Sequence, residues 1–334
     1  MTKRTRLFLF VATGILVAGL GTGLLASYMD LQNLVLIGGD GPAELAYVSS
    51  DTKILAYADV RQVMDSELRQ KLMQFHPDSS TGADHFQQET GIDIRTDVDK
   101  VVASVSRDAT ADADRPLFLV RGRFDTARIE SLIRQKGGQA EDYQGRRFLT
   151  HPEAQMGLAF VEPGLVAVGS ASAVRRAIDT KMAGANVTDN AEVMRLVRDI
   201  DDGNAWAVAR FDALANAGNL PADVAKQLPP INWFAATGTI NGGIHAVLHA
   251  EARDDAAANN LRDVIRGFMA LAKMQTSQRT EFADLMNSFE LGGQGKTVSL
   301  GFAVPSELID ALSGLHALRP RPEAEPAPLP DPSL

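Results

Sequence analysis

Residues 233–252 read WFAATGTINGGIHAVLHAEA, two strand-like segments on either side of Asn241-Gly242-Gly243. An Asn-Gly pair readily adopts the left-handed backbone of a tight turn whose twist matches two antiparallel strands. Because side chains alternate along a strand, one face of the second segment carries Ile244, Ala246, Leu248 and Ala250. The pattern predicts an antiparallel hairpin with one apolar face.

A second pattern recurs upstream of the hairpin: an apolar, strand-like run ends in a capping residue and continues as an amphipathic helix. The runs begin at Ile54, Leu117, Leu165 and Trp206. The triplet Arg-Phe-Asp stands at two of the junctions, residues 123–125 and 210–212. We expect each Asp to accept the free N–H groups of the following helix as an N-cap.

A long helix is predicted directly after the hairpin. Its apolar residues recur every three or four positions, which predicts a stripe buried against the sheet. This stripe comprises Leu261, Val264, Ile265, Phe268 and Leu271. A last strand at residues 298–304 and a closing helix at residues 308–315 complete the pattern.

Strands joined by short turns and separated by single helices are typical of an α+β protein. We therefore expect a largely antiparallel sheet with helices on one face. The recurrence divides the folded part into two related halves, residues 46–185 and residues 190–317. Whether the halves form one continuous sheet or two domains stays open at this point.

The folded part is preceded by a basic flank, residues 1–6, and an uncharged segment, residues 7–29, which Asp30 ends. These 23 residues can cross a hydrocarbon core of about 30 Å. The basic flank places the N-terminus in the cytoplasm and the rest of the chain outside it. The alternative is a cleaved signal peptide. However, the apolar run exceeds the core of about 7–15 residues that such peptides have, and no small-x-small cleavage site follows it.

Two segments outside the folded part are expected to lack packed structure. Residues 30–45 include a Gly-Gly-Asp-Gly-Pro stretch and are predicted to be a linker. Residues 318–334 hold six of the fifteen prolines and are predicted to be an extended, disordered tail. The chain has no cysteine, so a domain outside the cytoplasm must be stabilised without disulfides.

Within the predicted membrane segment, small residues stand four positions apart, at Gly14 and Ala18 and again at Gly19 and Gly23. This spacing lets a second helix backbone approach closely, so that packing contacts hold the two helices together. We expect the segment to contact the lipid bilayer and to associate with itself or with another membrane subunit.

The charge balance excludes one class of partner. The formal net charge is −9, and without the three basic residues of the flank it becomes −12. Such a chain repels phosphate backbones, and no cluster of Lys and Arg offsets the repulsion locally. We therefore predict that the protein does not bind nucleic acid.

Several stretches resemble catalytic or metal motifs without meeting their requirements. His245 and His249 share a strand face, but their Cβ atoms would lie about 13 Å apart, too far for one zinc ion. Residues 292–297 end like a phosphate-binding loop, yet Glu290 stands where the first glycine is needed and a strand follows. Residues 50–53 match Ser-x-x-Lys, but they lead into a strand instead of starting a helix.

Carboxylates cluster at residues 93–99 and 199–202 without the spacing of a calcium loop. We expect them to cap helices and stabilise turns. Altogether the sequence predicts no catalytic, cofactor-binding or metal-binding residue, no cofactor and no enzymatic activity.

One resemblance adds to these inferences. Its motifs are Thr90-Gly91-Ile92-Asp93, DVDKV at residues 97–101, RGRFD at residues 121–125 and Tyr143-Gln144-Gly145. They resemble a pattern in uncharacterised bacterial exported proteins that have an N-terminal membrane anchor and repeated strand-helix modules, mainly over residues 46–185. The resemblance implies an envelope protein and supplies no activity and no site residues.

Three functions follow as hypotheses. The first is a single-pass protein of the bacterial inner membrane, with a cytoplasmic N-terminus and a periplasmic α+β domain. That domain would bind another membrane or periplasmic protein as an accessory subunit. The second is a carrier of a lipid or another apolar ligand between sheet and helices. The third is a hydrolase whose carboxylate site follows no known motif.

Overall fold

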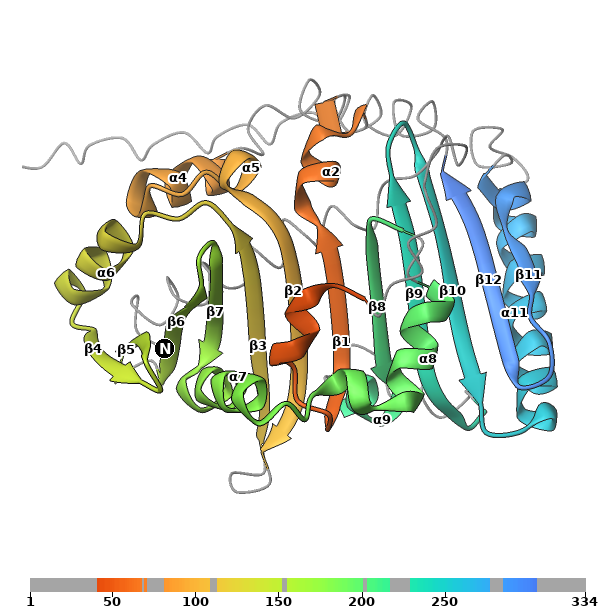
Figure 1. Ribbon diagram of the computed structural model, residues 1–334. Coiled ribbons are helices and arrows are strands. Elements are labelled where there is room, and N and C mark those ends of the chain that lie inside the picture. The colour runs from red at the N-terminus through yellow and green to blue at the C-terminus, as the bar shows by residue number, and fades with distance from the viewer. Residues whose placement is uncertain are drawn as a thin grey trace, which may run out of the picture.

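The computed structural model describes residues 41–67, 69–70, 81–108, 113–151, 155–200, 203–216, 229–276 and 285–304 (Figure 1). Its strands are β1 (Thr52–Asp59), β2 (Val98–Asp108), β3 (Ala113–Gly122), β4 (Gln139–Tyr143), β5 (Arg146–His151), β6 (Met156–Glu162), β7 (Leu165–Ser170), β8 (Ala205–Arg210), β9 (Ile231–Ile240), β10 (Ile244–Ala252), β11 (Glu290–Gly292) and β12 (Thr297–Val304). They form one 12-stranded sheet in the order β11-β12-β10-β9-β8-β1-β2-β3-β7-β6-β5-β4. Every neighbouring pair is antiparallel.

The two halves of the chain therefore share one continuous sheet. The first half supplies β1 to β7, the second supplies β8 to β12, and they meet at the pair β1–β8. In each half three consecutive strands lie side by side, and the last strand, β7 or β12, returns beside the third. The halves thus share the order of their first three strands and their last strand on either side of a central antiparallel pair, although the first half has seven strands and the second has five.

The described helices are η1 (Ala43–Tyr47), α2 (Val60–Asp65), α4 (Thr81–Thr90), α5 (Ile94–Asp97), α6 (Thr126–Gln135), α7 (Ala171–Ala183), η4 (Val187–Asp189), α8 (Ala191–Ile200), α9 (Phe211–Asn216) and α11 (Asp255–Thr276). They cover both faces of the sheet, so the prediction of helices on one face is wrong. Leu119 packs in the cluster that includes residues of α7 and α8, whereas its neighbour Val120 packs with residues of α2. Likewise Trp233 joins the α8 side, and Phe234 packs against Phe211 of α9. Because consecutive side chains point to opposite faces, apolar residues at adjacent positions require cover on both.

Apolar side chains of β1 and β8 pack against each other on the face of the sheet that α7 and α8 cover. Leu55 lies opposite Val208, and both side chains are buried. The rings of Tyr57 and Trp206 stack with their centroids 5.6 Å apart. This contact joins the cores of the two halves into one cluster.

The local expectations for turns and caps are mostly confirmed. The hairpin β9–β10 turns at residues 241–243, as predicted. Asp59, Asp125 and Ser170 each accept a backbone N–H as the N-caps of α2, α6 and α7. Asp212 is different: it lies inside the first turn of α9, and its carboxylate accepts from the Arg210 side chain. The second Arg-Phe-Asp triplet therefore does not cap its helix, because α9 already begins at the Phe.

The predicted stripe of α11 is buried only in its first half. Leu261 packs against the sheet with Ala257 and Ala258. Phe268 and Leu271, expected inside, are 60% and 57% exposed. Periodicity shows which side chains share a side of the helix, but not how far the sheet extends beneath it.

Some predictions lie outside the described residues: the membrane segment 7–29, the linker up to residue 40, the closing helix and the proline-rich tail. Within the described part of the chain, no helix is both long and apolar enough to cross a bilayer. The anchor therefore stays a prediction from the sequence.

Asn204 ties the end of β9 to the central strands. Its side chain donates to Ile240 O (2.9 Å) and accepts from Ile240 N (2.8 Å), while its own carbonyl accepts from Asp59 N (2.7 Å). Both Asn204 and Ile240 are buried. The side-chain amide of Asn204 thus makes the two hydrogen bonds with Ile240 that a residue of a neighbouring strand would otherwise make.

We expect Asn204→Ala to lower the free energy of unfolding by about 2–4 kcal/mol, because it leaves a buried N–H and a buried C=O without partners. Urea unfolding followed by circular dichroism measures the change. Asn259→Ala, at an exposed position on α11, serves as the control and should change stability by less than about 0.5 kcal/mol. Equal effects of the two substitutions would contradict the role given to Asn204.

Candidate functional site

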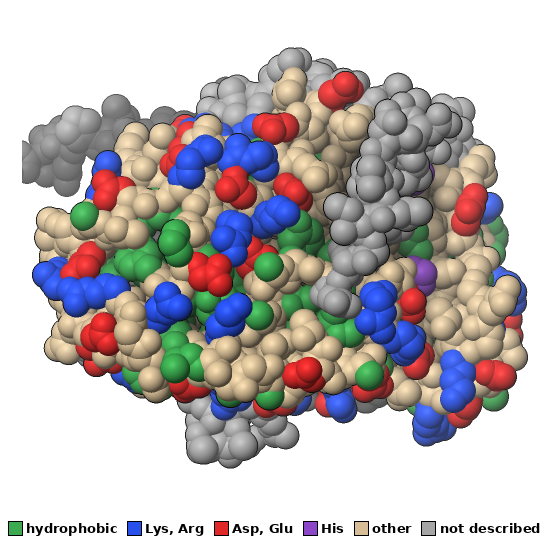
Figure 2. All heavy atoms as spheres, viewed as in Figure 1, with side chains coloured by type: hydrophobic (Ala, Val, Ile, Leu, Met, Phe, Trp, Pro, Cys, Tyr) green, Lys and Arg blue, Asp and Glu red, His purple; other side chains and the backbone are tan. Residues whose placement is uncertain are grey.

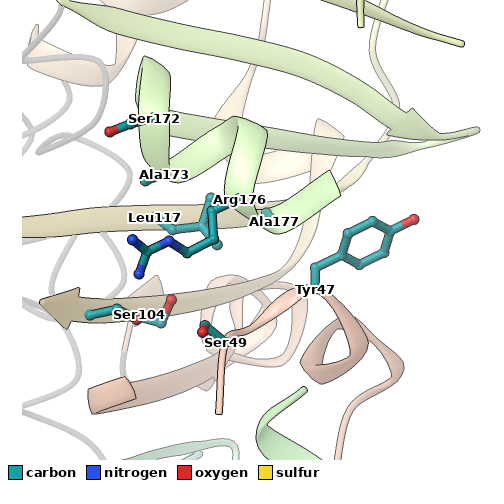
Figure 3. Close-up of a pocket in the computed structure, with 9 residues that line it drawn as sticks. Tyr47, Ser49, Ser104, Leu117, Ser172, Ala173, Arg176 and Ala177 are labelled. Carbon is teal, nitrogen blue, oxygen red and sulfur yellow. The ribbon is translucent and has the colours of Figure 1, made fainter. Parts of the chain in front are cut away.

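A narrow cleft lies between α7, the strands beneath it and the segment that follows η1 (Figure 3). It encloses about 340 Å³ of space free of protein atoms, part of it open to solvent. The lining consists of Tyr47, Ser49, Ser104, Ser106, Leu117, Ser172, Ala173, Arg176 and Ala177. Four serine hydroxyls, one tyrosine and one guanidinium thus line it, with no carboxylate among them.

The strands place two of these hydroxyls on the core side of the sheet. Ser104 and Ser106 stand two apart on β2, and Ser104 lies between Leu55 and Leu117 on the neighbouring strands. They continue the row of Val102, which is in the main core. On this face of β2, serines therefore replace apolar side chains beneath the first turn of α7.

The helix α7 forms the other wall. Ser170 caps it by accepting from Ala173 N at 3.2 Å, which fixes where the first turn begins. Ser172 and Arg176 are one turn apart and both line the cleft. Figure 3 shows the Arg176 side chain extending from α7 across the strands, with its guanidinium above Ser104.

Arg176 has a carboxylate nearby at the mouth of the cleft. Its Nη1 lies 3.5 Å from Asp51 Oδ2, and both side chains are about half exposed. A single contact of this length between exposed groups contributes little stability. The guanidinium can therefore leave Asp51 at small cost.

A second polar cluster lies behind the ring of Tyr47. In Figure 3 the hydroxyl of Tyr47 points away from the cleft, and it donates to Glu162 Oε1 at 2.9 Å. Arg121 binds Glu44 through Nε and Glu162 through Nη2, the latter at 3.2 Å. Lys181 adds a cation 5.1 Å from the centre of the Tyr47 ring.

Two of these side chains, Tyr47 and Glu162, have shifted pKa values that bear on their charge. Burial, together with the hydrogen bond to Glu162, raises the pKa of Tyr47 to about 12. Burial acts to raise the pKa of Glu162, but the bonds from Tyr47 and Arg121 outweigh it and the pKa is lowered. Both groups therefore keep their ordinary charge states at neutral pH.

The hydrolase hypothesis needs two convergent carboxylates in different protonation states. Glu44 and Glu162 do converge, but Arg121 lies between them and pairs with both. Glu162, whose pKa is lowered by these bonds, is stabilised as an anion and is not suited to donate a proton. The cluster is best explained as the clamp that holds η1 on the sheet.

The other residues that the sequence singled out are dispersed. His245 and His249 lie on β10, facing the same side as Glu251, and burial lowers the pKa of His245. Residues 293–296 form the turn between β11 and β12, so the glycine-rich stretch connects two strands as expected. No group of three or more potential metal ligands occurs within the described ranges.

The turn and cap roles predicted for the acidic clusters are confirmed in part. Asp93 caps α5 and accepts from Arg95, Asp97 accepts from Asp93 N, and Asp99 pairs with Arg61. Asp199 instead lies inside α8, where it pairs with Arg195, and residues 201–202 lie outside the described ranges. Figure 2 shows acidic and basic side chains interspersed over the described part of the α7–α8 face, with no continuous basic area. Gly14, Ala18, Gly19 and Gly23 lie outside the described residues.

Sequence reasoning missed the serines of the cleft. In the run Val101-Val102-Ala103-Ser104-Val105-Ser106, hydroxyls alternating with valines are typical of a strand whose serines face solvent. The sequence pattern could have identified these serines as buried only if it were known that helices cover both faces of the sheet.

Comparisons with known proteins add little. No protein-family model and no curated protein matches the chain. Three crystal structures of the protein TP0453 are similar to it. Crystal form III has a TM-score of 0.49 and 10% identity, and the match covers 83% of this chain and 100% of that one. Crystal form IV has a TM-score of 0.45 and 10% identity, covering 82% and 96%. At these values the likeness carries no information about function.

The raised pKa of Tyr47 leads to a pH-dependent prediction. The hydroxyl titrates near pH 10 in the unfolded chain and near pH 12 in the folded one. Its stabilising effect is therefore complete below pH 10 and is lost as the pH rises from 10 to 12. Tyr47→Phe should cost about 2 kcal/mol at pH 8, and the difference from wild type should shrink above pH 10. Urea unfolding across this range measures it; a difference independent of pH would contradict the assignment.

Proposed function

We propose that this protein is a single-pass envelope protein of the bacterial inner membrane, tethered by residues 7–29, whose exported α+β domain binds another membrane or periplasmic protein as an accessory subunit. The observation that supports the binding role is a row of three exposed apolar side chains in the second half of α11, called the stripe from here on. The tether rests on the sequence of the first thirty residues.

The stripe consists of Phe268, Leu271 and Met274, which are 60%, 57% and 74% exposed. Their spacing of three residues places them on one side of the helix. A fourth large apolar side chain, Leu248, is exposed on the strand face that α11 begins to cover. Exposed apolar side chains scattered singly are ordinary on a soluble surface, whereas a group of them points to an interaction site.

The surroundings of the stripe suit a protein partner. Asp263 and Arg266 form an exposed ion pair one turn before it, and Lys273 lies within it. A row of apolar anchors on one side of a helix, rimmed by charges, is a common way for a helix to dock in a partner's groove. The first half of α11 packs against the sheet, and these anchors continue along the same helix beyond it.

The tether predicts where the protein is found. After extraction of membranes with alkaline carbonate, the full-length chain should remain with the lipid, because about 20 apolar residues insert stably. Immunoblotting of the membrane and soluble fractions, with N-terminal sequencing of the product, measures this. A soluble chain that begins downstream of residue 29 would overturn the tether while leaving the binding role open.

The binding role is tested with Phe268→Gln combined with Leu271→Gln. Both positions are exposed, so the free energy of unfolding should change little, while recovery of the partner should fall about tenfold or more, as for the loss of central apolar anchors. Co-purification in mild detergent, with mass spectrometry of the bound proteins, provides the measurement. Met182→Gln is the matched control, because Met182 is an exposed methionine on α7.

The outcomes separate the alternatives. A specific protein that is lost only with the stripe variant supports the proposal. Recovery of the protein alone in several mild detergents would overturn it. A lipid retained by wild-type protein in native mass spectrometry, with no protein partner, would favour the carrier hypothesis instead.

A further inference from the structure

The cleft beneath α7 contains buried hydroxyls for which the described part of the chain supplies no hydrogen-bond partner. Ser104 and Ser106 are 3% and 8% exposed. No residue in the described ranges forms a hydrogen bond with either hydroxyl. Since buried polar groups nearly always have partners, two such groups lining one cleft indicate that something else binds them.

The other lining groups identify the charge of that ligand. Arg176 brings a permanent positive charge, and Ser49 and Ser172 bring two more hydroxyls. The lining contains no carboxylate, so a metal ion or an ammonium group would find no counter-charge there. The first turn of the 13-residue α7 forms one wall, and its partial positive charge also favours an anion.

The number of donors narrows the class of anion. Four hydroxyls and a forked guanidinium can surround an anion from several sides, which suits a tetrahedral group with three terminal oxygens better than a flat carboxylate with two. The weak contact of Arg176 with Asp51 can be exchanged for a charge-assisted bond to such a group. The negative charge of the whole chain opposes long-range attraction of anions but acts weakly over these distances in salt.

We propose that this cleft binds a phosphate group, held by Arg176, Ser104 and Ser106 together with Ser49 and Ser172. The phosphate is either the free inorganic ion or the terminal group of a small phosphorylated molecule. The site lies on the face of the sheet opposite α11 and does not depend on the function proposed for the stripe.

The first test is isothermal titration of the full-length protein in mild detergent with inorganic phosphate, with glycerol 3-phosphate and, as the flat anion, with acetate, all at constant ionic strength. Saturable binding of a phosphate probe at one site, with acetate at least tenfold weaker, is expected. Tighter binding of glycerol 3-phosphate than of phosphate identifies the terminal group as the ligand, and the reverse identifies the free ion. Absence of saturable binding by both phosphate probes, or binding of acetate as tightly, overturns the proposal.

The second test uses variants of the cleft. Arg176→Gln should weaken binding about tenfold or more, because a charge-assisted bond is lost. Arg175→Gln is the matched control: it removes the same charge from the neighbouring position, where the side chain pairs with Glu141 outside the cleft. Equal losses in the two variants would mean that only overall charge matters, and would overturn the site.

The third test distinguishes a ligand site from a structural role of the serines. Ser104→Ala combined with Ser106→Ala removes two unsatisfied buried hydroxyls, so the melting temperature without phosphate should stay the same or rise. The rise in melting temperature on adding phosphate should disappear. A lowered melting temperature without phosphate, with an unchanged response to phosphate, would show that the hydroxyls stabilise the fold and do not bind the ligand.

Discussion

The antiparallel pairing of β1 with β8 is the constraint on which the rest of the structure depends. Each of these strands is the first of its half, and each would be an open edge if the halves were separate. Their pairing buries Leu55 against Val208 and stacks Tyr57 on Trp206, which merges two cores into one. The remaining edges are β4, which carries Glu141 and Asp142, and the three-residue β11. Charged and short edge strands resist further pairing, so the sheet ends there.

What the sequence predicted well was local. The turn after β9 and the N-caps at Asp59, Asp125 and Ser170 depend on residues within four positions of one another, and the structure confirms them. The antiparallel α+β class also follows from local turns and is confirmed. Asp212 shows the limit of this reasoning: the triplet is the same as at Asp125, but the helix begins two residues earlier relative to it.

What could not be predicted depends on which surfaces meet. Helices pack on Val120 as well as on Leu119, whose side chains lie on opposite faces of the sheet. The pattern of a single strand does not show which helix packs on which face. For the same reason the local pattern suggests that Ser104 faces solvent, although it is buried, and predicts that Phe268 is in the core, although it is exposed. In both cases the local pattern is correct and the surroundings reverse its meaning. Both side chains belong to the features to which we assign a function, and such sites are where local rules are expected to fail.

The clamp at η1 connects the proposed tether with the proposed phosphate cleft. With residues 7–29 in a bilayer, the first described helix after the linker is η1, and any pull on the tether reaches the domain there. Glu44 and Tyr47 hold this helix to Arg121 and Glu162 on the sheet. The ring of Tyr47 and the adjoining Ser49 also line the cleft. Because the polar contacts of Tyr47 lie on the far side of its ring, they can resist such a pull without occupying the cleft. The clamp would thereby keep a pull on the proposed tether from changing the geometry of the cleft. The stripe of α11 lies in the other half and on the other face, so the full thickness of the sheet separates it from the clamp and the cleft.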